Sequence, residues 1–223
     1  MIYFVPLFIE TVILFLLSRS MSKILSKFLS INLIALIFLP GVFIHELSHL
    51  FIAAILFVPV GEMEFVPKKS GNGVKLGSVE IAKADPIRRS IIGFAPIFSG
   101  LMIVVGIVYL FNSNLLFLQN QGMYVYVAVI LVIAYLLFAV SNTMFSSKVD
   151  MEGTVEIMIA LFIIFVAAYI LGFRPPLEHL NKIFTKELIG IIQKSVLFLL
   201  APITIDLFIL GMVKLFTNSR NRS

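Results

Sequence analysis

The stretch FIHELSHLFIAA, residues 43–54, places two histidines and a glutamate in a run that is otherwise almost entirely apolar. His45, Glu46 and His49 all lie within one and a half turns of a helix, if the segment is helical. An ionisable side chain at the centre of a membrane helix costs roughly 2.5 to 3.5 kcal/mol even on the lenient insertion scales. A segment that carries three such groups must therefore hold something that compensates for them.

The composition of the chain is that of a membrane protein. Of 223 residues 60% are hydrophobic and 13% are charged, and the mean hydropathy is +1.09, far above that of soluble domains. The apolar residues are grouped in segments that each approach the ~20 residues needed to cross a bilayer. These segments are 2–17, 31–58, 90–111, 123–141, 153–172 and 195–216. The sequence therefore predicts an all-α polytopic membrane protein with about six transmembrane helices in a single domain, 1–223.

The first segment is the shortest and contains Glu10. No basic residue precedes Arg19 and no small-residue cleavage site follows, so we interpret it as a membrane span and not as a signal peptide.

The chain has no cysteine and a formal net charge of +5. The absence of cysteine excludes disulfides, thiolate metal ligands and a cysteine nucleophile. The basic residues are spread over all the polar connections, which favours contact with lipid headgroups and argues against binding to nucleic acid.

Two polar connections have a recognisable pattern. In the loop 59–84, apolar residues mostly alternate with polar ones on either side of KKSGNG, as in a β-hairpin. Asp85 and Pro86 then have the residue types of an N-cap and a first helical position. Residues 175–194 are expected to form an amphipathic helix on the membrane surface before the last span.

The distribution of basic residues gives an expected orientation. Six Lys or Arg residues lie between the second and third spans, and the 112–122 connection has none. By the positive-inside rule, we expect the hairpin loop and both termini to lie on the cytoplasmic side of a cell membrane.

The second span has the residues of a metal site. His45 and His49 are four residues apart, so on a helix both imidazoles can bind one metal ion. Zinc fits this set best, because it takes nitrogen and carboxylate ligands and leaves a fourth position for water. Bound zinc lowers the pKa of that water to about 7, and Glu46 is placed to take its proton as a general base. The sequence thus predicts one Zn²⁺ ion, which would compensate for the ionisable groups.

The third protein ligand is left open by the spacing. The carboxylates near polar breaks are Asp150, Glu152 and Glu156, and Glu10 and Asp206 lie within other spans. His179 lies in the expected surface helix, on the face opposite the hairpin loop, and is disfavoured.

Three motifs, in order, resemble those of the site-2 protease family of intramembrane zinc metalloproteases. HELSH lies in an early core helix, GFAPIFSG (93–100) is similar to the family's small-residue segment, and SNTMFSSKVDMEG (141–153) is similar to its later Asn…Asp motif. The resemblance covers about residues 31–172, including a hairpin loop after the metal helix. The sequence departs from the family at Phe145 and Ser147, where the family has prolines, and at Met151, where it has glycine.

The resemblance implies that His45, His49 and Asp150 bind the zinc ion and that Glu46 is the base. It implies that Asn142 contacts the substrate or the developing oxyanion, although an interhelical hydrogen bond would equally explain this residue. The implied function is hydrolysis of membrane-anchored protein substrates within or near the bilayer. An alternative is a catalytically inactive membrane protein whose metal site serves binding or metal transport, but such a site has no need of Glu46 beside the first histidine.

A transmembrane substrate must also be unwound before it can be cut, because a helix holds its carbonyl groups in its own hydrogen bonds. The expected hairpin could hold an unwound peptide by adding it to a sheet edge, or it could be an ordinary connection.

Overall fold

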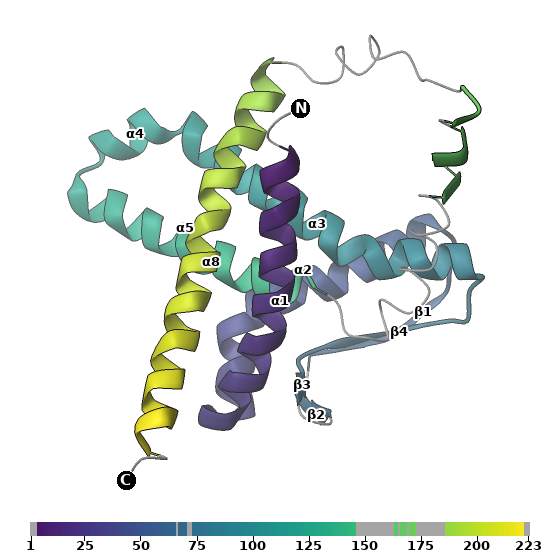
Figure 1. Ribbon diagram of the computed structural model, residues 1–223, viewed down its shortest axis with the longest axis horizontal. Helices are drawn as coiled ribbons and strands as arrows, with labels where there is room; N and C mark the ends of the chain where they lie inside the picture. Colours follow the sequence, from purple (N-terminus) through teal and green to yellow (C-terminus); the bar gives the residue numbers. More distant parts are fainter. Residues whose placement is uncertain are drawn as a thin grey trace.

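The computed structural model describes residues 4–65, 67–70, 73–145, 163–164, 166–168, 170–172 and 186–220. The longer elements are helices (Figure 1). The helices are α1 (Phe4–Phe28), α2 (Ile31–Ile55), α3 (Pro86–Ser113), α4 (Leu115–Asn120), α5 (Met123–Thr143) and α8 (Lys186–Arg220). The strands are β1 (Val60–Glu64), β2 (Lys68–Ser70), β3 (Gly73–Lys75) and β4 (Ser78–Ile81).

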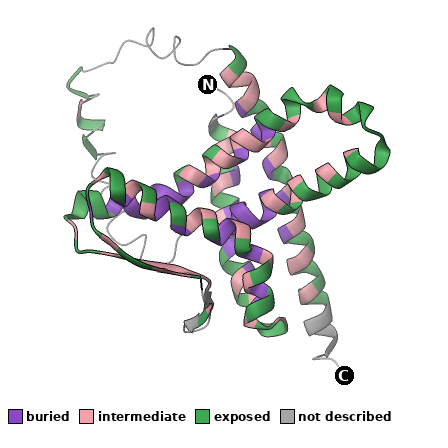
Figure 2. Ribbon diagram, turned by 180° about the vertical axis from the view of Figure 1, so that it is seen from behind, coloured by how far each residue is buried: buried purple, intermediate pink, exposed green. Residues whose placement is uncertain are grey.

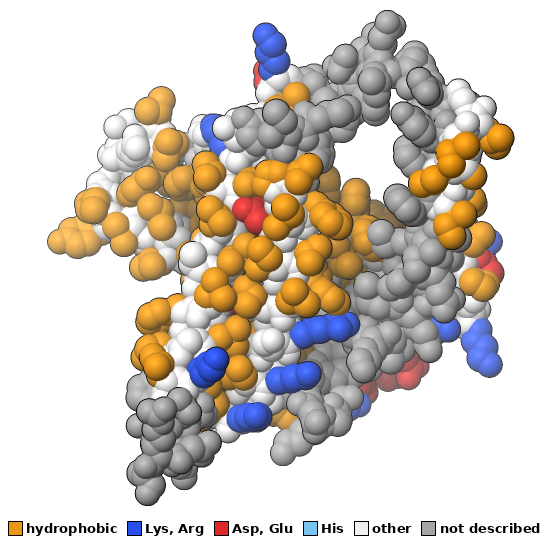
Figure 3. Space-filling model, in the orientation of Figure 1, with side chains coloured by type: hydrophobic (Ala, Val, Ile, Leu, Met, Phe, Trp, Pro, Cys, Tyr) orange, Lys and Arg blue, Asp and Glu red, His pale blue; other side chains and the backbone are white. Residues whose placement is uncertain are grey.

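Five of the described helices are long and apolar enough to cross a membrane, namely α1, α2, α3, α5 and α8. Large apolar side chains such as Phe8, Leu36 and Phe51 are more than half exposed on them, as a lipid-facing surface requires. Figure 3 shows that apolar side chains dominate the face formed by α1 and α8. The predicted class of helical polytopic membrane protein is thus confirmed. Most of the expected span 153–172 lies outside the described residues.

Helix α1 is longer than the sequence predicted. The expected span ends at residue 17, but the helix continues through the polar residues to Phe28. Lysine, arginine and serine are compatible with a helix, and long basic side chains can reach the membrane surface from within it. The Arg19 guanidinium carbon lies 4.3 Å from the centroid of the Phe15 ring, one turn earlier. The polar segment after residue 17 is therefore helical and not a loop, as far as Phe28.

Helices α1 and α8 lie side by side and run in the same direction (Figure 1). Leu14 packs with Leu199 and Ile203, and further along Met21 and Leu25 pack in one cluster with Ile205 and Ile209. Successive membrane spans alternate in direction, so five spans make the first and last parallel, and six would make them antiparallel. Phe4 and Arg220 lie at opposite ends of the pair. The expected location of both termini on the cytoplasmic side stays a prediction.

The loop after α2 contains two short antiparallel pairings. β1 pairs with β4, with Met63 opposite Val79 and Glu64 opposite Ser78, and β2 pairs with β3. A shift of register between Val60 and Met63 divides the β1–β4 ladder. Asp85 then caps α3, since its Oδ1 atom accepts hydrogen bonds of 3.1 Å from the backbone nitrogens of Ile87 and Arg88. The prediction of Asp85 as the N-cap is confirmed.

The C-terminal part begins, among the described residues, with α8. The sequence predicted a surface helix over 175–194 and a separate span over 195–216. From Lys186 onward the structure has one continuous helix of 35 residues, ~52 Å long, with Pro202 inside it. Residues 175–185 of the expected surface helix lie outside the described residues.

The buried residues gather where the helices meet in the middle of the molecule (Figure 2). The C-terminal end of α5 is held there between α2 and α3. A Cβ atom on Gly41 would collide with Thr143 Oγ1 and the Ala139 carbonyl, and one on Gly100 would lie 2.6 Å from the Met144 Cβ. Two glycines thus let α5 end close to α2, about one helical turn before His45.

Candidate metal centre

His45 and His49 face one another on α2, near its C-terminal end. Their Nε2 atoms are 3.2 Å apart, and the two rings lie nearly perpendicular, at 83°. The i, i+4 spacing produces this contact directly, because one helical turn brings the two side chains to the same face. His49 is 4% exposed, so its imidazole is removed from solvent and lipid.

The orientation of His49 is fixed by a backbone carbonyl of α3. His49 Nδ1 lies 2.9 Å from the carbonyl oxygen of Ile92. A carbonyl can only accept, so Nδ1 carries the proton, and in the neutral ring Nε2 keeps its lone pair toward His45. A carbonyl that holds the second nitrogen in this way is typical of histidines that bind metals.

The Ile92 carbonyl is available for this bond because of Pro96. In a helix the carbonyl of residue 92 accepts from the backbone nitrogen of residue 96, and proline has no N–H to donate. Pro96 is fully buried inside α3. The alanine–proline pair that carries the family resemblance therefore has a physical role here, which is to supply an acceptor to His49.

A Pro96→Ala variant is expected to weaken this orientation, because the alanine N–H competes for the Ile92 carbonyl. We expect zinc affinity to fall about tenfold, within the range seen when an outer partner of a metal-bound histidine is lost. Competition titration with a zinc-binding dye would measure the change. Pro202→Ala, a matched removal of a helix-interior proline in α8, is expected to leave zinc affinity unchanged. Equal losses in both variants would contradict a specific role for Pro96.

Glu46 is buried on the same helix, between the two histidines in sequence, and is only 6% exposed. The linker between β3 and β4 lies directly against its carboxylate. A Cβ atom on Gly77 would be 2.8 Å from Glu46 Oε1 and 2.9 Å from Val42 Cγ1. The hairpin loop therefore packs against Glu46, and a larger residue at position 77 would have to displace the carboxylate or the Val42 side chain.

The histidine pair fits a zinc ion. Two nitrogen ligands at 2.0–2.1 Å in a tetrahedral site lie about 3.3 Å apart, close to the 3.2 Å between the Nε2 atoms. The third ligand cannot be placed in the same way. Asp150, Glu152, Glu156 and His179 lie outside the described residues, and the described part contains no group of three or more potential His, Cys, Asp or Glu ligands.

Asn142 lies at the end of α5 and contacts α8. Its Nδ2 atom donates to the Phe138 carbonyl at 3.1 Å and to Asp206 Oδ1 at 2.9 Å. Both amide hydrogens are thus used, and none remains for an oxyanion. In this conformation the geometry favours an interhelical hydrogen bond over oxyanion contact.

Two intramembrane carboxylates were candidate ligands. Asp206 is fully buried with Asn142, and Glu10 on α1 is 7% exposed. Glu10 Oε2 and Asp206 Oδ2 have no hydrogen-bond partner in the part of the chain that the structure describes. In the structure Asp206 accepts a hydrogen bond from Asn142, which gives this carboxylate an interhelical role. The sequence held no signal for this pairing, because the residues are 64 positions apart.

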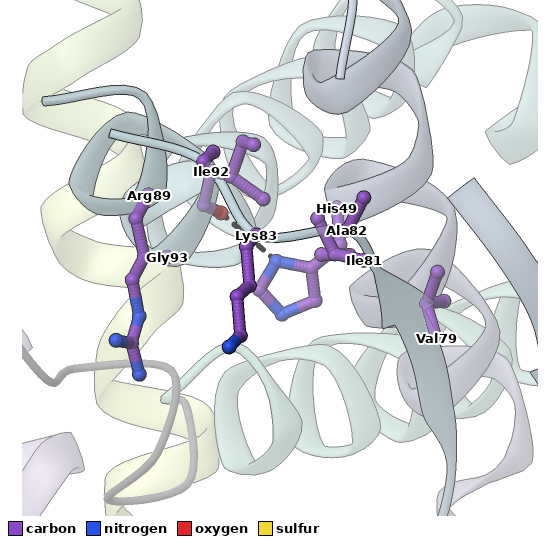
Figure 4. A pocket seen from close by; sticks show the side chains of 9 residues that line it. His49, Val79, Ile81, Ala82, Lys83, Arg89, Ile92 and Gly93 are labelled. Carbon is purple, nitrogen blue, oxygen red and sulfur yellow. Dashed lines mark hydrogen bonds between the residues drawn. The ribbon is translucent and has the colours of Figure 1, made fainter. Parts of the chain in front are cut away.

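A pocket of about 570 Å³ opens beside His49 (Figure 4). Val79 and Ile81 of β4 form one wall and Ile92 and Gly93 of α3 form another. Gly93 begins the small-residue segment that carries the family resemblance, so this segment lies against the histidine pair. The pocket thus leaves open space directly beside the histidine pair.

The candidate metal centre thus consists of His45, Glu46 and His49 on α2, an orienting carbonyl on α3, and a covering loop above Glu46. Each part comes from a different segment of the region 31–100, within the span of the family resemblance. Comparison of the chain with models of protein families, with curated proteins and with solved structures gave no match.

Proposed function

We propose that the chain is a membrane-embedded zinc metalloendopeptidase that hydrolyses peptide bonds of membrane-anchored proteins. The observation that carries the proposal is the histidine pair on α2, with Nε2 atoms 3.2 Å apart and the buried carboxylate of Glu46 between them in sequence. The resemblance to the site-2 protease family points to the same residues and adds Asp150 as the third ligand.

His45 and His49 would hold the ion, with the Ile92 carbonyl fixing the second ring. When bound, zinc supplies a positive charge that polarises the scissile carbonyl and acidifies a water molecule. Glu46 accepts the proton of the attacking water and delivers it to the amide nitrogen as the peptide bond breaks. The cover formed by Gly77 excludes bulk water from Glu46, which strengthens its interactions with nearby charge.

A substrate helix has to be extended before its carbonyl can reach the ion. β4 supplies a surface for this, since it lies along the pocket beside His49 and hydrogen-bonds only with β1 among the described strands. Backbone hydrogen bonds to its other edge would hold an unwound segment of substrate in an extended form.

The test of the proposal is a zinc analysis of the purified chain together with cleavage of a model transmembrane substrate. We expect about one zinc ion per chain, loss of cleavage on chelation and its return on addition of zinc. Stoichiometric zinc without cleavage would instead support the inactive metal-binding protein. Purified protein that neither contains nor takes up zinc would overturn the proposal.

For the orientation, we propose that the hairpin loop and the N-terminus face the cytoplasm, because the loop has six basic residues and the 112–122 connection has none. As part of this proposal, the parallel arrangement of α1 and α8 favours a C-terminus on the opposite side, outside the cytoplasm.

Single cysteines in this cysteine-free chain can test the orientation. Gly71→Cys is expected to resist an impermeant thiol reagent in intact cells, whereas Asn120→Cys and Asn218→Cys are expected to react. Lysed cells, in which all three should react, serve as the control. If Asn218→Cys resists the reagent in intact cells as Gly71→Cys does, the result would support six spans with both termini inside.

A further inference from the structure

The turn that ends α2 holds a phenylalanine in a conformation that suits glycine. Over the described ranges of the chain, Phe57 is the one residue other than glycine with a positive φ, at +54°. A side chain rarely adopts this left-handed backbone, because its Cβ atom comes too close to the following carbonyl oxygen. For a residue as bulky as phenylalanine the conformation is a marked exception, and it requires a cause beyond the local backbone.

The backbone at this position is fixed by the cap of α2. The Val58 N–H donates to the Ala53 carbonyl at 2.9 Å, and the Phe57 N–H donates to the Ala54 carbonyl at 3.1 Å. These two hydrogen bonds form a Schellman motif, which needs a left-handed residue at position 57 and usually has glycine there. Val58 is buried and packs in one cluster with Ala53 and Ile92. The chain is therefore held in place next to Phe57.

The ring of Phe57 contributes almost nothing to the packing of the chain, since the residue is 90% exposed. A glycine would form the same cap without the unfavourable contact of a Cβ atom. The fold thus keeps a large apolar side chain where it strains the backbone and gains little contact in return. A side chain held in this way acts on something outside the chain.

The face of α2 that leads to this turn indicates what lies outside. Large apolar side chains, each 43% to 62% exposed, follow one another at intervals of four residues, namely Leu47, Phe51 and Ile55. Positions four apart share one face of a helix, so these side chains form an apolar stripe that reaches the last turn of α2. On a membrane span such an exposed stripe faces the acyl chains of the lipid. Phe57 lies just beyond its end.

Charged groups begin at the same end of the molecule. The Ala82 N–H donates to the Pro59 carbonyl at 3.0 Å, so the linker into α3 lies beside the turn. Three residues after Ala82, Asp85 pairs with Arg88, and both side chains are about half exposed. An exposed ion pair belongs in water or among headgroups and not in hydrocarbon. Phe57 therefore lies between an apolar stripe and charged groups, as residues at a membrane–water interface do.

We propose that Phe57 is an interfacial anchor, whose ring inserts at the boundary between the lipid headgroups and the acyl chains and fixes the depth of α2 in the bilayer. Phenylalanine is one of the residues that membrane-surface segments place at this boundary. His49 lies eight residues earlier, about 12 Å along the helix axis. The anchor thus also sets how far below the membrane surface the candidate metal centre lies. Anchoring does not depend on the proposed peptidase activity.

The depth of position 57 can be measured by fluorescence, because the chain has no tryptophan. Phe57→Trp and, as the matched control, Phe51→Trp each introduce one fluorophore, and the two positions are about 9 Å apart along α2. Each chain is placed in nanodiscs of phosphatidylcholine whose acyl chains carry bromine either near the headgroup or near the chain end. We expect the shallow bromine to quench Phe57→Trp about twofold more than the deep bromine does, and the order to be reversed in Phe51→Trp.

Two results of this measurement would overturn the proposal. Quenching of Phe57→Trp by iodide in the buffer, with no effect of either brominated lipid, would place the ring in water. The same ratio of shallow to deep quenching in both chains would mean that position 57 is as deep as the middle of the apolar stripe.

A second experiment tests whether the ring fixes the depth, since tryptophan itself prefers the interface. In the Phe51→Trp chain, Phe57→Gly removes the ring and keeps the cap. We expect the ratio of shallow to deep quenching to change by about twofold, because α2 can then shift or tilt in the bilayer. Phe117→Ala, which removes a 62% exposed ring from α4, should leave the ratio unchanged. An unchanged ratio in Phe57→Gly would overturn the anchor, and so would an equal change in Phe117→Ala.

Discussion

A Glu46→Gln variant is expected to lose proteolytic activity by about three orders of magnitude while keeping its zinc, the loss expected when a general base is removed. Glutamine has the shape of glutamate but cannot accept the proton of the attacking water. The carboxylate is enclosed beneath Gly77, with only 2.8 Å between Oε1 and the position of a Cβ there, so an isosteric amide is the replacement that disturbs the packing least. Initial rates on a model transmembrane substrate and zinc content by mass spectrometry give the two readouts.

Glu62→Gln makes the same chemical change on an exposed residue of β1 and should leave both readouts unchanged. Cleavage by Glu46→Gln at the wild-type rate would refute the assignment of the base. Loss of zinc from Glu46→Gln would instead make Glu46 a ligand.

The second large effect is expected at Asp150, which the family resemblance implies as the third ligand. Asp150→Asn should lower zinc affinity by more than about 100-fold and abolish cleavage, because an amide lacks the charge that makes aspartate a good zinc ligand. The competing role of Asp150 is that of a helix N-cap, with Ser147 three residues before it. Asparagine caps a helix about as well as aspartate, so a cap would survive the change.

Zinc titration, cleavage and thermal unfolding of the apo-protein distinguish the two roles. If Asp150 is a ligand, Asp150→Asn should lose zinc and activity while the stability of the apo-protein is unchanged. If Asp150 is only a cap, stability, zinc affinity and activity should all stay near wild type. Glu152→Gln and Glu156→Gln are the matched controls and are expected to bind zinc normally. If Asp150→Asn binds zinc and turns over substrate normally, Asp150 is not the third ligand. The assignment then passes to Glu152 or Glu156, whichever variant loses zinc.

The sequence predicted those parts of the fold that depend on local chemistry. Asp85 caps α3 because its short carboxylate reaches the free N–H groups of the first turn, and Pro86 needs no donor there. The contact between His45 and His49 follows from helical spacing alone. The predicted end of the first helix at residue 17 is wrong, because basic and polar side chains are compatible with a helix and α1 continues to Phe28.

The parts that could not be predicted depend on contacts between distant segments. The Asn142–Asp206 hydrogen bond joins α5 and α8. No local sequence pattern predicts how these two helices lie relative to one another. The parallel arrangement of α1 and α8 likewise depends on how many spans separate them, which hydropathy alone left at about six. The sequence does contain one local signal for the site. Pro96 inside an apolar helix frees the carbonyl four residues earlier, so a partner for Ile92 could have been sought among the histidines.

The proline in α3 also bears on how the centre assembles. A carbonyl without a donor is costly inside a membrane protein, and His49 supplies that donor as soon as α2 packs against α3. The ring is therefore held in its ligand orientation by the folding of the helix pair, before any ion arrives. One of the two proposed nitrogen ligands, His49, would already be fixed when an ion arrives. The entropic cost of ordering its side chain would have been met during folding and would not weaken the binding of the ion. Under the proposed function, this one hydrogen bond makes the folding of the helical core and the preparation of the metal site the same event.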